Sequence, residues 1–304
     1  MSYESFVVEE ELNSSHAPSP LSTESCASLR NSKLQQAANR QRVYLRKKTT
    51  TKLRELLKRN ALILYYEPIL YPQTTKISGA SAILKIQRQG IGPIPAQHIL
   101  SLVEDSTILI DIGCWMVGQV LHRTKKFPRH FVFTLPVSAY LLRSPKFISY
   151  VVNSLNNLKI ASGRLQFALT DEAIRADMSD LDAPIQSLAE AGVTFSVAHY
   201  GAIEKALQML EEWSFSTLVL DKYLVKSALE SKEQSRKLNA LCKTVHAYNC
   251  TVRVTGVESP DMITSYGAMG IDELQGSAVA TAVPLTGLLT HTRQTSPLEM
   301  AEME

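Results

Sequence analysis

The residues that could do chemistry in this chain stand where short apolar segments end. His199 follows the β-branched segment 193–197, and Asp221 and Glu258 follow two later segments of the same kind. In parallel α/β proteins, the residues just past the carboxyl end of a strand form the active site. Position 198 is an alanine, and a lone histidine is more often a hydrogen-bonding residue than a metal ligand. These strand ends therefore carry fewer ionisable side chains than an α/β active site needs.

The elements that must position these residues alternate regularly. Strand-like segments are predicted at 61–66, 76–84, 131–137, 165–169, 193–197, 217–220, 251–254 and near 271–279. Helical patterns lie between them, at 146–158, 185–191, 202–213, 223–248 and 260–269. Eight strands alternating with helices over this length predict an α/β fold of the (β/α)8 barrel class. A doubly wound open sheet is the alternative, but Gly90-Ile91-Gly92 precedes prolines and does not form a phosphate-binding turn.

Charge is distributed unevenly along the 304 residues, although the net charge is only +3. We divide the chain into an acidic Ser/Pro leader (1–29), a basic helical segment (30–59), a barrel (60–290) and a flexible tail (291–304). The leader is predicted to be partly disordered because it has little apolar surface to bury. The basic segment could contact nucleic acid or an anionic membrane surface through five cations. These are Arg40, Arg42, Arg46, Lys47 and Lys48.

Composition excludes several classes of protein. No apolar run approaches the roughly 20 residues of a membrane span, and the glutamates of the first twelve residues do not suit a signal peptide. We therefore predict a cytoplasmic location. The four cysteines have no CxxC spacing, which favours reduced thiols packed as small apolar groups.

Seven short segments, in order and at suitable spacing, resemble motifs of the EAL domain family. Members of this family are bacterial cyclic di-GMP phosphodiesterases built as a modified TIM barrel. Leu64–Ile69 is similar to the opening "YQPI" strand, and Gly113–Trp115 is similar to "IGxW". The other segments resemble "NxSA", "DDFG", the end of "KID", "EGVE" and "QG". They are Pro136–Ala139, Ala198–Gly201, Leu220–Asp221, Thr255–Glu258 and Gln275–Gly276.

The departures from these motifs remove most of the side chains that the family uses. Ser81 replaces the glutamate of the "EAL" tripeptide, and Lys85 stands in place of the arginine that follows it. Further substitutions fall at the metal-ligand and catalytic-lysine positions: Pro136, Ala168, Ala198, His199, Val219 and Thr255. Three polar groups of the motifs persist, namely Asp221, Glu258 and Gln275, and Asp171 is a conservative replacement.

The resemblance implies metal-assisted hydrolysis, and the departures argue against it. A pair of Mg²⁺ or Mn²⁺ ions needs several hard anionic oxygens, which alanine, proline and valine lack. We therefore expect a degenerate, catalytically inactive EAL-type barrel with no cofactor, acting in bacterial signalling through an unidentified protein partner. A non-hydrolysing cyclic di-GMP receptor is the alternative, although loss of the arginine and the metals leads us to expect weak cyclic di-GMP binding. The resemblance also makes a homodimer plausible.

Overall fold

The computed structural model describes residues 40, 43–88, 90–100, 103, 107–169, 180–199 and 215–293. Contacts divide the chain into two units, residues 1–48 and residues 49–304. In the first unit, residues 43–48 are helical. The second unit contains the barrel, and its first helical residues, 49–58, bury Leu53 completely. The leader 1–29, predicted to be partly disordered, and the predicted helix 202–213 lie outside the described residues.

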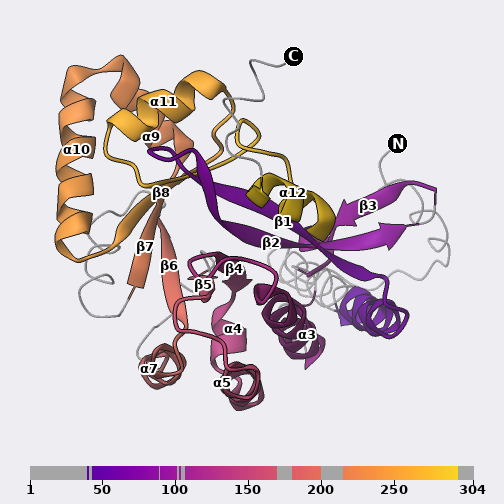
Figure 1. Cartoon of the computed structure of the whole chain (residues 1–304). Coiled ribbons are helices and arrows are strands. Elements are labelled where there is room, and N and C mark those ends of the chain that lie inside the picture. The colour runs from indigo at the N-terminus through magenta and orange to yellow at the C-terminus, as the bar shows by residue number, and fades with distance from the viewer. Residues whose placement is uncertain are drawn as a thin grey trace, which may run out of the picture. The chain divides into compact units, whose positions relative to one another are not determined.

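Eight strands close into a barrel in the order β1-β9-β8-β7-β6-β5-β4-β2, and β2 pairs with β1 to complete the circle (Figure 1). Strand β1 is antiparallel to both of its neighbours, whereas the other barrel pairings are parallel. The barrel strands are β1 (Leu62–Tyr71), β2 (Lys76–Arg88), β4 (Val132–Val137), β5 (Leu165–Leu169), β6 (Thr194–His199), β7 (Phe215–Leu220), β8 (Thr251–Thr255) and β9 (Glu273–Gln275). The predicted α/β barrel of modified TIM type is therefore confirmed.

A short ninth strand, β3 (Gly92–Pro95), was not predicted. It pairs with the end of β2 that extends beyond the barrel, opposite residues 85–88. Two of its four residues are prolines, which makes the segment look like a loop in the sequence. Prolines are accepted in a strand only at a sheet edge, and β3 occupies that place in the sheet order.

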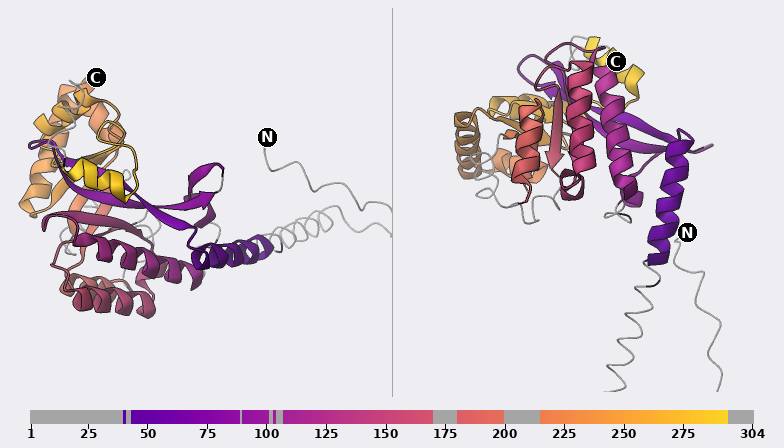
Figure 2. Two further views of the ribbon diagram at one scale, coloured as in Figure 1. Left: turned by 45° about the vertical axis from the view of Figure 1, so that its right-hand side comes forward. Right: turned by 90° about the horizontal axis from the view of Figure 1, so that it is seen from below.

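The helices lie outside the barrel, and α3 and α5 run side by side (Figure 2). They are α2 (Gln97–Leu100), α3 (Thr107–Thr124), α4 (Ala139–Leu142), α5 (Pro145–Leu158), α7 (Asp182–Glu190), α9 (Lys222–Glu230), α10 (Lys232–Ala247), α11 (Pro260–Ala268) and α12 (Leu285–Arg293). The prediction of one helix over 223–248 was wrong. Ser231 has extended backbone angles and caps α10 by accepting a hydrogen bond from the Gln234 N–H, so the segment forms two helices.

Alternate residues of the strands face two different environments. The outward residues pack under the helices and include a row of aromatic rings on neighbouring strands, Phe167, Phe195 and Phe215, with centroids 6.1 and 6.0 Å apart. The inward residues below the carboxyl ends of the barrel strands are largely polar. Gln166, Ser196 and Arg253 are almost completely buried inside the barrel. This alternation follows from the period of two in a β-strand, and it fixes which residues face the candidate site. In β7 a register shift interrupts the alternation, so that Phe215 faces outward and Thr217 inward.

Candidate functional site

The register of the parallel strands brings most of the predicted positions to one end of the barrel, which we call the mouth. Pro136 pairs with Ala168, and Ala198 pairs with Val219. On the other side of the barrel, Thr255 pairs with Gln275. All of these residues lie at or near the carboxyl ends of their strands. The strand register therefore brings these positions together, and their side chains are mostly apolar.

The polar side chains that remain at the mouth bind one another. The Gln275 amide donates to the Glu67 carboxylate at 2.7 Å, and the Ser81 hydroxyl donates to the Gln275 carbonyl oxygen at 3.1 Å. The three residues belong to adjacent strands, since Glu67 pairs with Ser81 between β1 and β2. Gln275 is buried and the other two are half-buried. Its buried amide is thus satisfied by the protein itself.

Glu67 was missed as a site residue in the sequence. It lies within a segment quoted only as a strand motif, where the family pattern has glutamine. Its inward direction depends on the β1–β2 register, which the sequence does not show. The only available signal was a carboxylate within an otherwise apolar strand.

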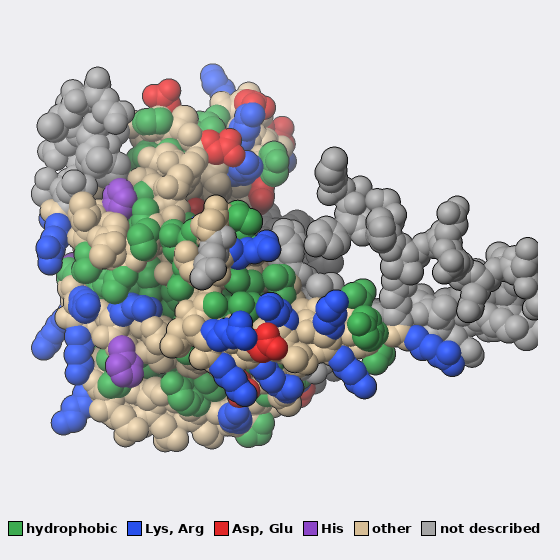
Figure 3. Space-filling view, turned by 90° about the vertical axis from the view of Figure 1, so that its right-hand side faces the viewer, with side chains coloured by type: hydrophobic (Ala, Val, Ile, Leu, Met, Phe, Trp, Pro, Cys, Tyr) green, Lys and Arg blue, Asp and Glu red, His purple; other side chains and the backbone are tan. Residues whose placement is uncertain are grey.

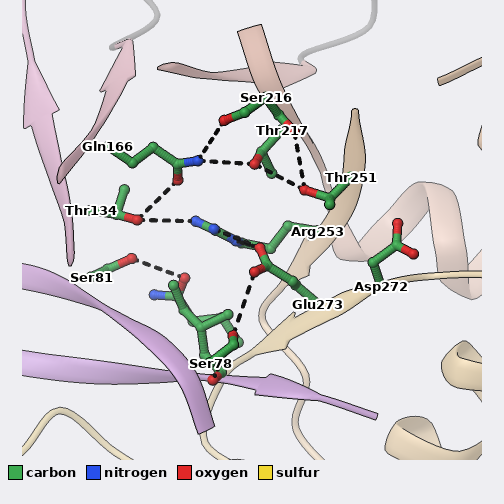
Figure 4. A network of polar contacts seen from close by, with 12 residues as sticks. Ser78, Ser81, Thr134, Gln166, Ser216, Thr217, Thr251, Arg253, Asp272 and Glu273 are labelled. Carbon is green, nitrogen blue, oxygen red and sulfur yellow. Dashed lines mark hydrogen bonds and ion pairs between the residues drawn. The ribbon is translucent and has the colours of Figure 1, made fainter. Parts of the chain in front are cut away.

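Below the mouth, polar side chains form a network across the barrel interior (Figure 4). Arg253 and Glu273, whose side chains are 3% and 8% exposed, form an ion pair at 2.6 Å. The network continues from Arg253 to Thr134 and then to Gln166. Its other members are Ser78, Ser216, Thr217 and Thr251. Most of these polar groups have protein partners, so the network stabilises the barrel and does not present free ligands to the mouth.

At the rim of the mouth, Asp221 and Glu258 are committed to local contacts. Asp221 is the N-cap of α9 and accepts a hydrogen bond from the Tyr223 N–H at 2.7 Å. The Glu258 carboxylate is exposed and pairs with Lys222. The hydrogen bond from Lys222 lowers the pKa of Glu258, and the same bond raises the pKa of Lys222. The Lys222 side chain also passes over Gly256, so this contact joins the β7–α9 and β8–α11 loops.

Lys85 does not join this cluster, and the side chains of two further predicted positions lie outside the described residues. Lys85 lies four residues beyond Ser81 on β2, about 13 Å along the strand, and its ammonium group sits 4.0 Å from the centre of the Tyr65 ring. His199 is the last residue of β6 and pairs with Leu220 through its backbone, but its side chain lies outside the described residues. Asp171 is also outside them.

Gly276 is required by packing. Its φ is +153°, and a Cβ atom there would lie 2.3 Å from backbone atoms of Val257. The "QG" pair is thus explained by the approach of two loops, without any ligand.

The side chains that the structure describes at the mouth do not fit a pair of divalent cations. Such a pair needs several carboxylates that bridge or flank the ions. Within the described ranges, no group of three or more His, Cys, Asp or Glu side chains is placed to hold a metal ion. Among the residues that the structure describes, Glu67 is the single inward carboxylate at the mouth, and it is bound to Gln275.

Comparison with known families identifies the barrel. Residues 50–282 match the EAL domain family. The chain belongs to the EAL domain family. Among its relatives is the signalling protein YkoW of Bacillus subtilis, which is 20% identical over 235 residues, covering 76% of this chain and 29% of YkoW. The chain spans about a third of the length of this and similar curated relatives.

Solved EAL structures share the fold. The EAL enzyme Bd1971, in a form bound to cAMP and cyclic di-GMP, has a TM-score of 0.73 and 17% identity, covering 89% of this chain and 75% of Bd1971. The FimX EAL domain of Xanthomonas citri, in complex with cyclic di-GMP, has a TM-score of 0.70 and 17% identity, covering 81% of this chain and 97% of FimX.

These structures correct one expectation from the sequence. We expected cyclic di-GMP binding to be disfavoured, and this expectation was wrong, because EAL domains of the same fold contain bound cyclic di-GMP. The physical reason is that a nucleotide pocket combines many apolar and hydrogen-bonding contacts. Loss of metal ligands and of one arginine therefore does not decide nucleotide binding.

Within the described part of the chain, no helix combines the length and apolar character that crossing a bilayer requires.

Cys114, Cys242 and Cys250 are buried free thiols, as predicted. Cys26 lies outside the described residues.

Proposed function

We propose that this chain is a non-catalytic EAL domain that regulates by binding and does not cleave a phosphodiester. The observation that carries the proposal is the contact chain Ser81–Gln275–Glu67 at the mouth. In this contact chain, Gln275 binds Glu67, the one inward carboxylate among the described residues of the mouth. The facing strand ends carry Pro136, Ala168 and Val219. Metal-assisted attack by water needs anionic oxygens at these strand ends.

The test is an incubation of the purified full chain with cyclic di-GMP and Mn²⁺, with the products separated by chromatography. The phosphodiesterase domain of Pseudomonas aeruginosa MucR, known in complex with cyclic di-GMP, provides an active comparison under the same conditions. We expect no product above the rate of a protein-free blank. Metal-dependent hydrolysis that co-purifies with the folded chain would overturn the proposal.

For the ligand of such a domain, cyclic di-GMP is the first candidate. Similar EAL domains hold it, and the rim of this barrel presents a cation beside an exposed aromatic ring. Tyr223 is 71% exposed, and the Lys222 ammonium group lies 5.5 Å from its ring centre. A tyrosine ring can stack on a base, and a lysine can pair with a phosphate, which here would replace Glu258 as the partner of Lys222.

Calorimetry with the full chain, cyclic di-GMP and Mg²⁺ or Ca²⁺ tests this ligand. If the chain is a nucleotide receptor, we expect saturable binding that Tyr223→Ala weakens. The matched control is Tyr248→Ala, at an exposed tyrosine after α10, and it should leave the affinity unaltered. Absence of a binding heat at millimolar cyclic di-GMP would contradict the proposal that the chain is a nucleotide receptor.

In the second candidate function, the domain acts as an adaptor through protein contact. The observation that favours it is the combination of a closed, well-packed barrel with a mouth whose polar groups are already satisfied. Affinity purification of the full chain from its native host, followed by mass spectrometry, tests the adaptor. Recovery of no stoichiometric partner by the folded chain would count against it.

A further inference from the structure

A group of basic side chains, four Lys or Arg and one His, lies at the end of the barrel opposite the mouth. The α3–β4 loop, residues 125–131, leads directly into the amino end of β4, and the α5–β5 loop leads into the neighbouring β5. We define the basic patch as five exposed residues of these loops: Lys125, Lys126, Arg129, His130 and Lys159.

The α3–β4 loop that carries four of these residues is held in place from below. Arg164 is 8% exposed and donates to the carbonyl oxygens of Thr124, Phe127 and Phe131 at 2.7, 3.3 and 3.1 Å. The rings of Phe127 and Phe131 are buried, with centroids 4.4 Å apart. The cations therefore project from a fixed backbone, so binding costs less conformational entropy than it would on a mobile loop.

The cations of the basic patch form no ion pair with any residue that the structure describes. Elsewhere on the barrel, some surface lysines are paired, as Lys146 is with Asp111, Lys222 with Glu258 and Lys237 with Glu233, whereas others, such as Lys232 and Lys243, have no ion pair among the described residues. The local sequence explains why the basic patch differs from the paired lysines, because residues 112–170 contain no Asp or Glu. Figure 3 shows Lys and Arg side chains over the lower part of one face, with few acidic side chains among them. The resulting positive potential favours an anionic partner.

We propose that the basic patch binds a short acidic segment of another protein. The loop presents no exposed Phe, Tyr or Trp ring on which a base could stack, since Phe127 and Phe131 are buried and His130 is its single exposed ring. Pro128 is the single exposed apolar residue of the loop, whereas membrane-surface binding combines cations with a larger apolar face. The carboxylates of an extended acidic segment need neither an exposed aromatic ring nor a large apolar face. Closely spaced lysine and arginine side chains can pair with these carboxylates.

The proposal does not depend on the function of the mouth. The basic patch and the mouth lie at opposite ends of the strands, and no residue belongs to both. A chain that hydrolysed cyclic di-GMP would disprove the proposed function and leave the basic patch untouched.

The experiment measures binding of a fluorescein-labelled oligoglutamate peptide to the full chain by fluorescence anisotropy at low ionic strength. The test variant is Lys125→Glu/Lys126→Glu/Arg129→Glu. The matched control is Lys232→Glu/Arg236→Glu/Lys243→Glu, which makes the same change in net charge at exposed positions of α10. Circular dichroism and thermal unfolding of each variant verify the fold. The milder variant Lys126→Gln/Arg129→Gln serves if charge reversal impairs folding.

We expect the test variant to lose at least about tenfold in affinity and the control to change by less than about twofold, because each exposed pair contributes a small increment and the three add up. The milder variant should fall between them, and added salt should weaken wild-type binding. Equal losses in test and control variants would overturn the proposal, since net charge alone would explain them. No binding by the wild-type chain would also overturn it. The proposal would also be overturned if the wild-type chain bound duplex DNA or phosphatidylserine vesicles more tightly than the oligoglutamate peptide and the test variant lost that binding.

Discussion

Gln275 on β9 donates its side-chain amide to the carboxylate of Glu67 on β1, at 2.7 Å, in the half-buried mouth of the barrel. The contact joins the first and the last strand of the barrel beside their short backbone ladder. Glu67→Ala should lower the free energy of unfolding by about 1–3 kcal/mol, because the buried amide loses a charged acceptor. Urea denaturation measures this change. Glu67→Gln is the control, since it keeps an oxygen acceptor, and an equal loss in both variants would contradict the assignment.

The ion pair of Arg253 and Glu273 predicts strongly unequal effects of single and double substitutions. Both side chains are buried, so Arg253→Met leaves an unpaired buried carboxylate and should cost about 3–5 kcal/mol. The double variant Arg253→Met/Glu273→Leu should cost less than this single change. Urea denaturation gives both values. As a control, Lys237→Ala breaks an exposed pair and should cost less than about 1 kcal/mol. A double variant whose cost equals the sum of the two single substitutions would refute the prediction.

The prolines of β3 predict an effect on self-association. The Ala96 N–H bonds to Leu84 of β2, so residues at alternate positions face β2, while Pro93 and Pro95 turn their nitrogens to the open edge of the sheet. This edge therefore offers no N–H donor at those two positions. Pro93→Thr/Pro95→Thr should increase dimers or aggregates, as measured by size-exclusion chromatography with light scattering. Pro128→Thr, at an exposed loop position, is the control and should stay unchanged.

The buried cysteines should resist alkylation in the folded protein. Burial raises the pKa of Cys242 to about 11, and it also raises the pKa values of Cys114 and Cys250. Since the thiolate is the reactive form, a Cys26→Ser variant should take up almost no iodoacetamide at neutral pH until denaturant is added. Mass spectrometry counts the adducts. Rapid labelling of Cys242 in the native state would contradict its described burial.

The Lys222–Glu258 pair predicts a limited dependence of stability on pH. The lowered pKa of Glu258 means that its contribution is present above the unfolded value of 4.5 and is lost as pH falls through the folded value. The raised pKa of Lys222 means that its contribution is present below 10.5 and is lost as pH rises through the folded value. Carboxyl NMR titration of Glu258 should give a pKa that rises toward 4.5 in Lys222→Gln. An unchanged pKa would show that the pair does not form in solution.

The sequence predicts the barrel well because its parallel strands are short, apolar and separated by helical patterns. It missed β3 because Pro93 and Pro95 are typical of loops, and only the position at the sheet edge makes them acceptable. The break at Ser231 was missed because the helical periodicity continues on both sides of a capping residue. Glu67 was missed for a different reason. Its role depends on pairing with strands far away in the chain, and a pattern within one strand does not show this.

The antiparallel β1 also determines when the barrel can close during synthesis. Glu67 and Gln275 are 208 residues apart, and ribosomes add about 5–20 residues per second. The first strand of a newly made chain therefore waits ~10–40 s for its last neighbour. During that interval β1 has β2 as a partner but has one open edge, so chaperone binding to nascent chains should be strongest before residue 275 leaves the ribosome.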